Sequence, residues 1–111
     1  MDAPAGRPEA AVPAVLLRRF TAAEAAVYPL AMTDPDRYQA AVTVVGLVFQ
    51  RLRGECPTID ALVHDLPDAA EQATQLAAAE GISLGGLPAD VIADAAAALR
   101  YRELRSGPLP S

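Results

Sequence analysis

The clearest hydrophobic pattern in the chain lies between residues 34 and 53. Large apolar side chains recur there at helical spacing, at Tyr38, Val42, Val45, Phe49 and Leu52. Steps of three and four residues follow one face of an α-helix, whereas a half-buried strand alternates every two residues. Asp34 is a suitable N-cap, Pro35 fits the first helical position, and Gly54 predicts the end. We therefore expect a helix from Asp34 to Arg53, and we expect it to form the centre of the fold.

A shorter helix is predicted before this segment. Thr21 and Glu24 have the spacing of a capping box, in which a hydroxyl and a carboxylate each accept from a free backbone N–H group. This pattern places a helix over residues 21–28 that ends before Pro29. The preceding segment VLLRRF (residues 15–20) is compatible with a helical turn or with an extended arm, and the sequence leaves both open.

Three further helices follow. Thr58 is a candidate N-cap for a short helix over residues 59–66, and Pro67 is a candidate first residue of another that ends at Glu80. Gly81 followed by an apolar residue is typical of a left-handed C-terminal cap. The last helix is expected to begin near Pro88 and to end near Arg105, with a buried stripe at Val91, Ile92, Ala95, Ala98 and Leu99.

These elements predict an all-α protein, a compact bundle of four to five short helices. No segment has the pattern of a strand. The proline-rich ends, residues 1–13 and 106–111, are predicted to be disordered tails that flank one helical domain over residues 14–105.

Composition adds that the core is thin. The 111 residues include 25 alanines, which make up nearly half of the apolar positions, and a single Cys excludes an internal disulfide. The chain has no export signal and no apolar run near the roughly 20 residues that cross a bilayer, so we expect a soluble, cytoplasmic protein that does not bind membranes.

The net charge of −5 is unevenly distributed, because residues 54–99 hold eight acids and no arginine. The simpler interpretation is that acids near helix starts and arginines near helix ends complement the helix dipoles. The alternative is an acidic face for a basic partner or for the arginines of a second copy.

Candidate catalytic and metal-binding residues are few. Cys56 and His64 are the only pair of the Cys/His type, eight positions apart, and one of each is too few for a structural zinc site. The carboxylate pairs could be drawn as acid–base dyads or metal ligands, but all except Asp94 lie near predicted helix starts, where capping explains them. These pairs are Asp34 with Asp36, Asp65 with Asp68, and Asp90 with Asp94. We expect no enzyme activity, no metal and no cofactor.

Two patterns typical of phosphate binding and of DNA binding are present only in part. Gly81, Gly85 and Gly86 lack the preceding strand and the GK[ST] ending of a phosphate-binding loop. Residues 76–83 have the spacing of a helix-turn-helix, but Gly85, Gly86 and Pro88 interrupt the recognition helix. DNA binding therefore depends mainly on three arginines of the last helix and is unlikely for an acidic chain.

Association remains as the function that the sequence favours. Small residues let helix backbones approach closely, so the expected contact residues are Gly46, Ala40 and Ala41, the Ala95–Ala98 run, and the basic group Arg100, Arg102 and Arg105. The competing interpretation is that alanine serves helix propensity on exposed faces. We interpret the chain as a small non-enzymatic interaction or accessory protein that self-associates or binds a partner encoded nearby. A DNA-binding or regulatory module is the first alternative, and an enzyme that uses Cys56 or a carboxylate pair is the second.

Overall fold

The computed structural model describes residues 12–84 and 86–106, and every regular element in these ranges is a helix. The elements are α1 (Ala14–Val27), α2 (Leu30–Thr33), α3 (Pro35–Glu55), α4 (Ile59–Ala79) and α5 (Ala89–Ser106). Four of them are long and α2 is a single turn, which confirms the predicted all-α bundle. Most of the predicted tails lies outside the described residues; within them, Val12 packs against the core and Ser106 is the last residue of α5.

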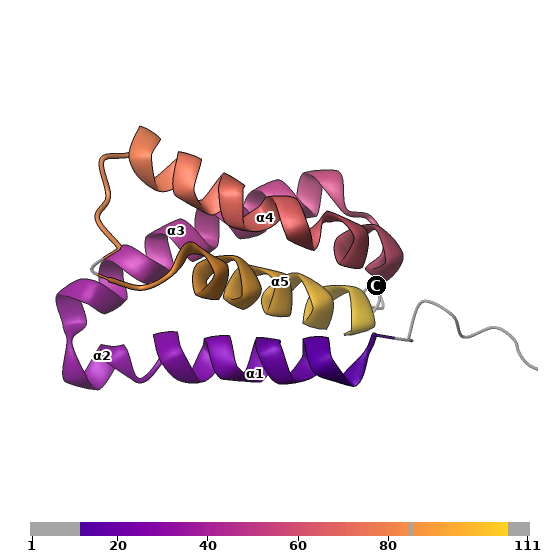
Figure 1. The fold of residues 1–111 in the computed structure, drawn as a ribbon, viewed down its shortest axis with the longest axis horizontal. Coiled ribbons are helices and arrows are strands. Elements are labelled where there is room, and N and C mark those ends of the chain that lie inside the picture. Colours follow the sequence, from indigo (N-terminus) through magenta and orange to yellow (C-terminus); the bar gives the residue numbers. More distant parts are fainter. Residues whose placement is uncertain (1–11, 85, 107–111) are drawn as a thin grey trace, which may run out of the picture.

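The centre of the bundle is α5, and the expectation that the 34–53 helix forms it is wrong. Figure 1 shows α5 between α1 and α4, with α3 behind it. Residues 92–98 of α5 are all buried, so this helix is covered on nearly every side, whereas α3 buries a single stripe. That stripe is Ala41, Val44, Val45, Val48 and Leu52.

The alanines explain why α5 occupies this position. Ala95, Ala96 and Ala97 are fully buried although they point in three directions around the helix. A helix that carries only methyl groups lets neighbouring backbones approach from several sides at once. The run is therefore used within the monomer, and it is available neither as a contact with a second copy nor as an exposed propensity-driven surface.

The first helix begins seven residues earlier than the capping box predicts. α1 starts at Ala14, so the VLLRRF segment is helical. Thr21 is not an N-cap, because its hydroxyl donates to the Leu17 carbonyl from inside the helix. Burial of Leu16 and Phe20 against the bundle favours the longer helix, and the Phe20 ring lies 5.8 Å from that of Tyr101 on α5.

The start of α3 is as predicted and its end is not. The Asp34 side chain accepts from the Arg37 N–H and Pro35 is the first helical residue. The helix continues through Gly54 to Glu55, since Leu52 and Cys56 are both buried and hold the last turn against the bundle.

A continuous α4 replaces the two helices expected on either side of Pro67. The Thr58 hydroxyl accepts from the Ala61 N–H, as predicted, but the helix then runs through the proline to Ala79. An interior proline costs about 3 kcal/mol of helix stability. Here Pro67 is exposed, and one buried face continues across it from Leu62 to Ala77, so packing outweighs the local cost.

The turn after α4 has the predicted left-handed cap. Gly81 has φ of 68°, and the Ile82 N–H donates to the Ala77 carbonyl over 2.8 Å. A residue with a side chain is strained at positive φ, so glycine is the natural residue at this position. The cap redirects the chain toward the start of α5.

No helix in the described ranges is long and apolar enough to cross a membrane.

Candidate interaction surface

The outer side of α1 carries exposed apolar side chains. The inner side of this helix packs against α5 through Leu16, Phe20, Ala23 and Val27, all buried. In the part of the chain that the structure describes, the large apolar side chains that stay exposed all lie between residues 15 and 32. They are Val15, Leu17, Tyr28 and Met32, with exposed fractions of 54%, 37%, 36% and 88%.

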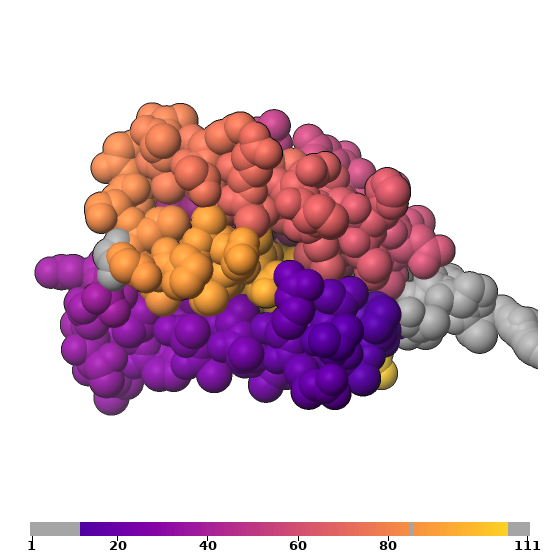
Figure 2. All heavy atoms as spheres, viewed as in Figure 1, coloured from indigo at the N-terminus to yellow at the C-terminus, as the bar shows by residue number. Residues whose placement is uncertain are grey.

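A shallow groove follows this outer side. It has a volume of about 430 Å³ and is lined by Leu17, Arg18, Thr21, Ala22 and Ala25. Because these positions repeat every three to four residues, they form one stripe along the helix, opposite the buried one. Figure 2 shows α1 uncovered at the surface of the molecule. α1 is therefore apolar on two sides, although only one of them is packed.

Arg18 is the only charged side chain in the groove. The two other charged residues of α1 are turned toward the bundle, where Arg19 binds Asp94 over 2.9 Å and Glu24 binds Arg102 over 2.6 Å. Arg18 makes no such ion pair with any residue in the described ranges. Burial, followed by the nearby Glu24 carboxylate, raises the pKa of Tyr28 at the end of the stripe.

The exposed sides of α3 and α4 have the opposite chemistry. On α3 the exposed positions include Asp36, Gln39, Thr43 and Gln50. On α4 they include Asp60, His64, Asp68, Glu71 and Gln75. A polar outer face is the usual state of a helix in a small soluble domain. The outer face of α1 departs from it.

The small residues of α3 that the sequence singled out do not share a surface. Ala41 is fully buried in the core and Ala40 is half-buried, so neither presents an open contact face. Gly46 is exposed among the polar residues of α3, and nothing lies within 4 Å of the position that its Cβ would occupy.

The three arginines of α5 have three different roles. Arg100 is buried, and its Nε and Nη2 donate to the Cys56 carbonyl over 3.1 and 2.9 Å, which caps the end of α3. Its Nη1 binds Glu103, which also pairs with Arg53. Arg102 pairs with Glu24, and Arg105 is exposed in the last turn. Because Arg100 is buried, the three arginines do not form one exposed basic group.

Cys56 and His64 are not brought together as a catalytic pair. Cys56 is 1% exposed and its thiol donates to Asp65 Oδ2 over 3.8 Å, whereas His64 is exposed on α4. Burial, with the carboxylates of Asp65 and Glu55, raises the pKa of Cys56 to about 11. Burial, with the carboxylates of Glu55 and Asp68, raises the pKa of Asp65 as well. A thiol in this state is protonated and is a poor nucleophile at neutral pH.

In two of the carboxylate pairs one member is held by an arginine. Asp34 caps α3, as predicted, and pairs with Arg37, and Asp94 is buried against Arg19. Across the described ranges, no three His, Cys, Asp or Glu residues cluster in a way that could hold a metal ion.

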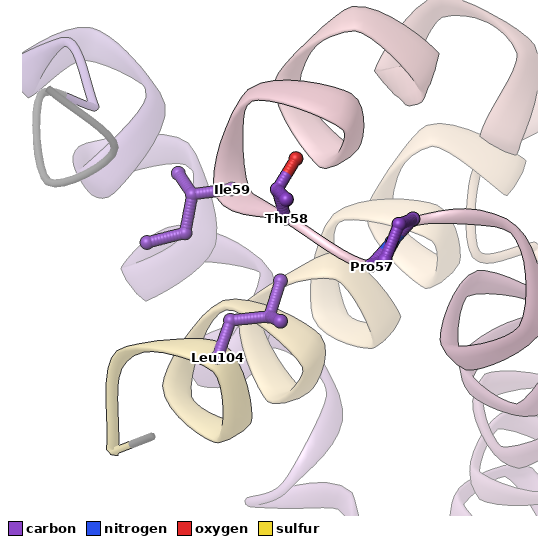
Figure 3. A pocket seen from close by; sticks show the side chains of 4 residues that line it. All are labelled: Pro57, Thr58, Ile59 and Leu104. Carbon is purple, nitrogen blue, oxygen red and sulfur yellow. The ribbon is translucent and has the colours of Figure 1, made fainter. Parts of the chain in front are cut away.

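A second, smaller hollow lies where α4 begins beside the end of α5. It has a volume of about 180 Å³ and is lined by Pro57, Thr58, Ile59 and Leu104. Figure 3 shows the Leu104 side chain extending from α5 toward the segment that carries Pro57, Thr58 and Ile59. Its lining contains no charged side chain, so it offers little to orient a ligand.

The α1 surface escaped the sequence prediction because the capping box placed the helix start at Thr21. A helix that starts at Ala14 places Leu17, Thr21, Ala25 and Tyr28 on one side and Leu16, Phe20, Ala23 and Val27 on another. Apolar positions at helical spacing on both sides were the available signal. No family model, curated protein or solved structure matches the chain.

Proposed function

We propose that the chain is a small, non-enzymatic interaction protein that binds a protein partner through the outer side of α1. The observation that carries the proposal is that the exposed large apolar side chains of the described ranges lie on α1, on α2 and in the turn between these helices. Exposed apolar stripes of this kind cost free energy in water and commonly mark interaction sites.

Several polar and small residues elsewhere in the bundle have structural roles. The Arg100 guanidinium donates to the Cys56 carbonyl and so joins α5 to α3. The ion pairs of Arg19 with Asp94 and of Arg102 with Glu24 join α1 to α5, and the alanines of α5 are buried in the core. Arg100, Cys56, Asp94 and Glu24 are thus engaged in contacts within the bundle. The outer side of α1 leaves an apolar stripe uncovered, and it is the surface that we assign to recognition.

A matched pair of variants tests the proposal. Ala25→Glu places a charge on the outer side of α1, and Ala78→Glu places the same charge at an exposed position on α4. The tagged wild type and both variants are expressed in the source cells and purified by the tag. We expect a species that the wild type and Ala78→Glu retain and that Ala25→Glu loses. Equal retention by all three proteins would contradict the proposal.

A further inference from the structure

We infer that the occupant of the α1 surface is a second copy of this chain, whose α1 packs antiparallel against the first; this rests on the proposed function of that surface. A symmetric dimer needs a surface that is complementary to itself. The residues of the stripe, their sizes and their charges meet that condition in one orientation.

The sizes of the side chains fit a pair centred on Thr21. Leu17, Thr21 and Ala25 follow one another at four-residue steps, the ridge that packs into the groove of another helix. When two such ridges cross antiparallel at Thr21, Leu17 of each copy lies opposite Ala25 of the other. The large residue then enters the space left by the small one, and this occurs twice by symmetry.

Charge decides between the antiparallel and parallel orientations. α1 has no acidic residue in its first turn and no basic residue in its last turn, and the cation near its negative C-terminal end is Arg102 of α5, which pairs with Glu24. Arg18 precedes Thr21 by three residues, which is about 4.5 Å along the axis. In the antiparallel pair it therefore reaches the last turn of the other α1. In a parallel pair the two Arg18 side chains would face each other.

The available area predicts a weak dimer. A 14-residue helix is about 21 Å long. One side of it covers only part of the roughly 800 Å² per partner that stable complexes bury. Even with the exposed Met32 of α2 added, we expect rapid exchange and a dissociation constant in the micromolar range or above.

Cysteine cross-linking tests the pairing directly, because Cys56 is buried and contributes little background. Thr21→Cys and Thr74→Cys are matched: both threonines are exposed on helices and donate to the carbonyl four residues earlier. Under mild oxidation at a protein concentration where the wild type sediments as a dimer, Thr21→Cys is expected to form covalent dimers and Thr74→Cys to remain at the wild-type level. Helix axes about 8 Å apart bring residues at the crossing within disulfide range.

A mixing experiment tests the orientation. The antiparallel pair predicts that Leu17→Cys and Ala25→Cys cross-link to each other when mixed, and much less when each is oxidised alone. Homodimers of each variant alone would indicate a parallel pair and overturn the inference. A wild type that sediments as a monomer at every concentration would also overturn it. In that case, a partner that the wild type retains and Ala25→Glu loses would leave the proposed function standing, and equal retention would end both.

Discussion

The helices α1 and α5 are both rich in alanine and use it in opposite ways. Ala95, Ala96 and Ala97 of α5 are fully buried among three other helices, whereas Ala22 and Ala25 of α1 are exposed along the groove. The same methyl group permits close packing within the monomer in one place and leaves an uncovered surface in the other. Alanine content alone therefore does not tell whether a side of a helix is packed, and only the position of the helix in the fold does.

Enlarging one alanine in each helix gives the largest expected difference. Ala96→Leu adds three carbons to a position with no free space and is expected to lower the free energy of unfolding by about 3 kcal/mol. Ala25→Leu, on the exposed side of α1, should change it by less than about 0.5 kcal/mol at concentrations that favour the monomer. Urea unfolding measures both. Similar losses in the two variants would mean that the outer side of α1 is packed within the monomer.

Arg100 is the buried cation of α5, and removing its guanidinium tests how much its hydrogen bonds to the end of α3 stabilise the fold. Arg100→Met retains most of the aliphatic length but leaves the Cys56 carbonyl without its two donors. We expect a loss of about 2 kcal/mol in the free energy of unfolding. Arg105→Met, in the exposed last turn, is the control and should cost little. Equal stability of the two variants would show that the cap on α3 contributes nothing.

The Cys56 thiol adds a pH dependence at the same contact. Its pKa of about 11 in the folded protein exceeds that of an exposed thiol, so the folded state holds this proton more tightly than the unfolded state. The stabilisation is present below about pH 8.5 and is lost as the pH rises toward 11, by up to about 3 kcal/mol. Thermal unfolding between pH 8 and 11 should show a steeper fall for the wild type than for Cys56→Ala. Parallel curves would contradict the assignment.

Gly46 gives the smallest expected effect. A Cβ at this exposed helical position meets nothing within 4 Å, so Gly46→Ala is expected to stabilise the protein by about 0.5–1 kcal/mol through helix propensity. Sedimentation of this variant should match that of the wild type, since the residue lies on the polar side of α3. A dimer lost in Gly46→Ala would move the contact from α1 to α3.

Local signals in the sequence predicted much of the fold. The Asp34 and Thr58 caps, Pro35 as the first residue of α3 and the Gly81 turn all depend on groups within a few residues of one another, and all are present. The prediction failed where packing outweighs a local signal. Pro67 lies within α4, and Thr21 lies inside α1 and does not cap it.

The contacts that join distant segments could not be predicted in the same way. Arg19 meets Asp94, Arg102 meets Glu24 and Arg100 meets the Cys56 carbonyl across most of the chain, and nothing in the spacing of these residues identifies their partners. The place of α5 at the centre has the same origin, because burial on every side depends on how the other helices surround it. With the start of α1 placed at Ala14, the apolar positions on both sides of the helix would have been enough to predict the α1 surface from the sequence.

Alanine methyl signals in NMR spectra, recorded from dilute to concentrated protein, test the central claim most directly. If the outer side of α1 contacts a second copy, the methyl groups of Ala22 and Ala25 shift as the concentration rises, while those of Ala78 and Ala79 on α4 and of the buried Ala95–Ala97 keep their positions. Unchanged signals from Ala22 and Ala25 at all concentrations, or shifts confined to α4, would contradict the assignment of α1 as the contact between copies.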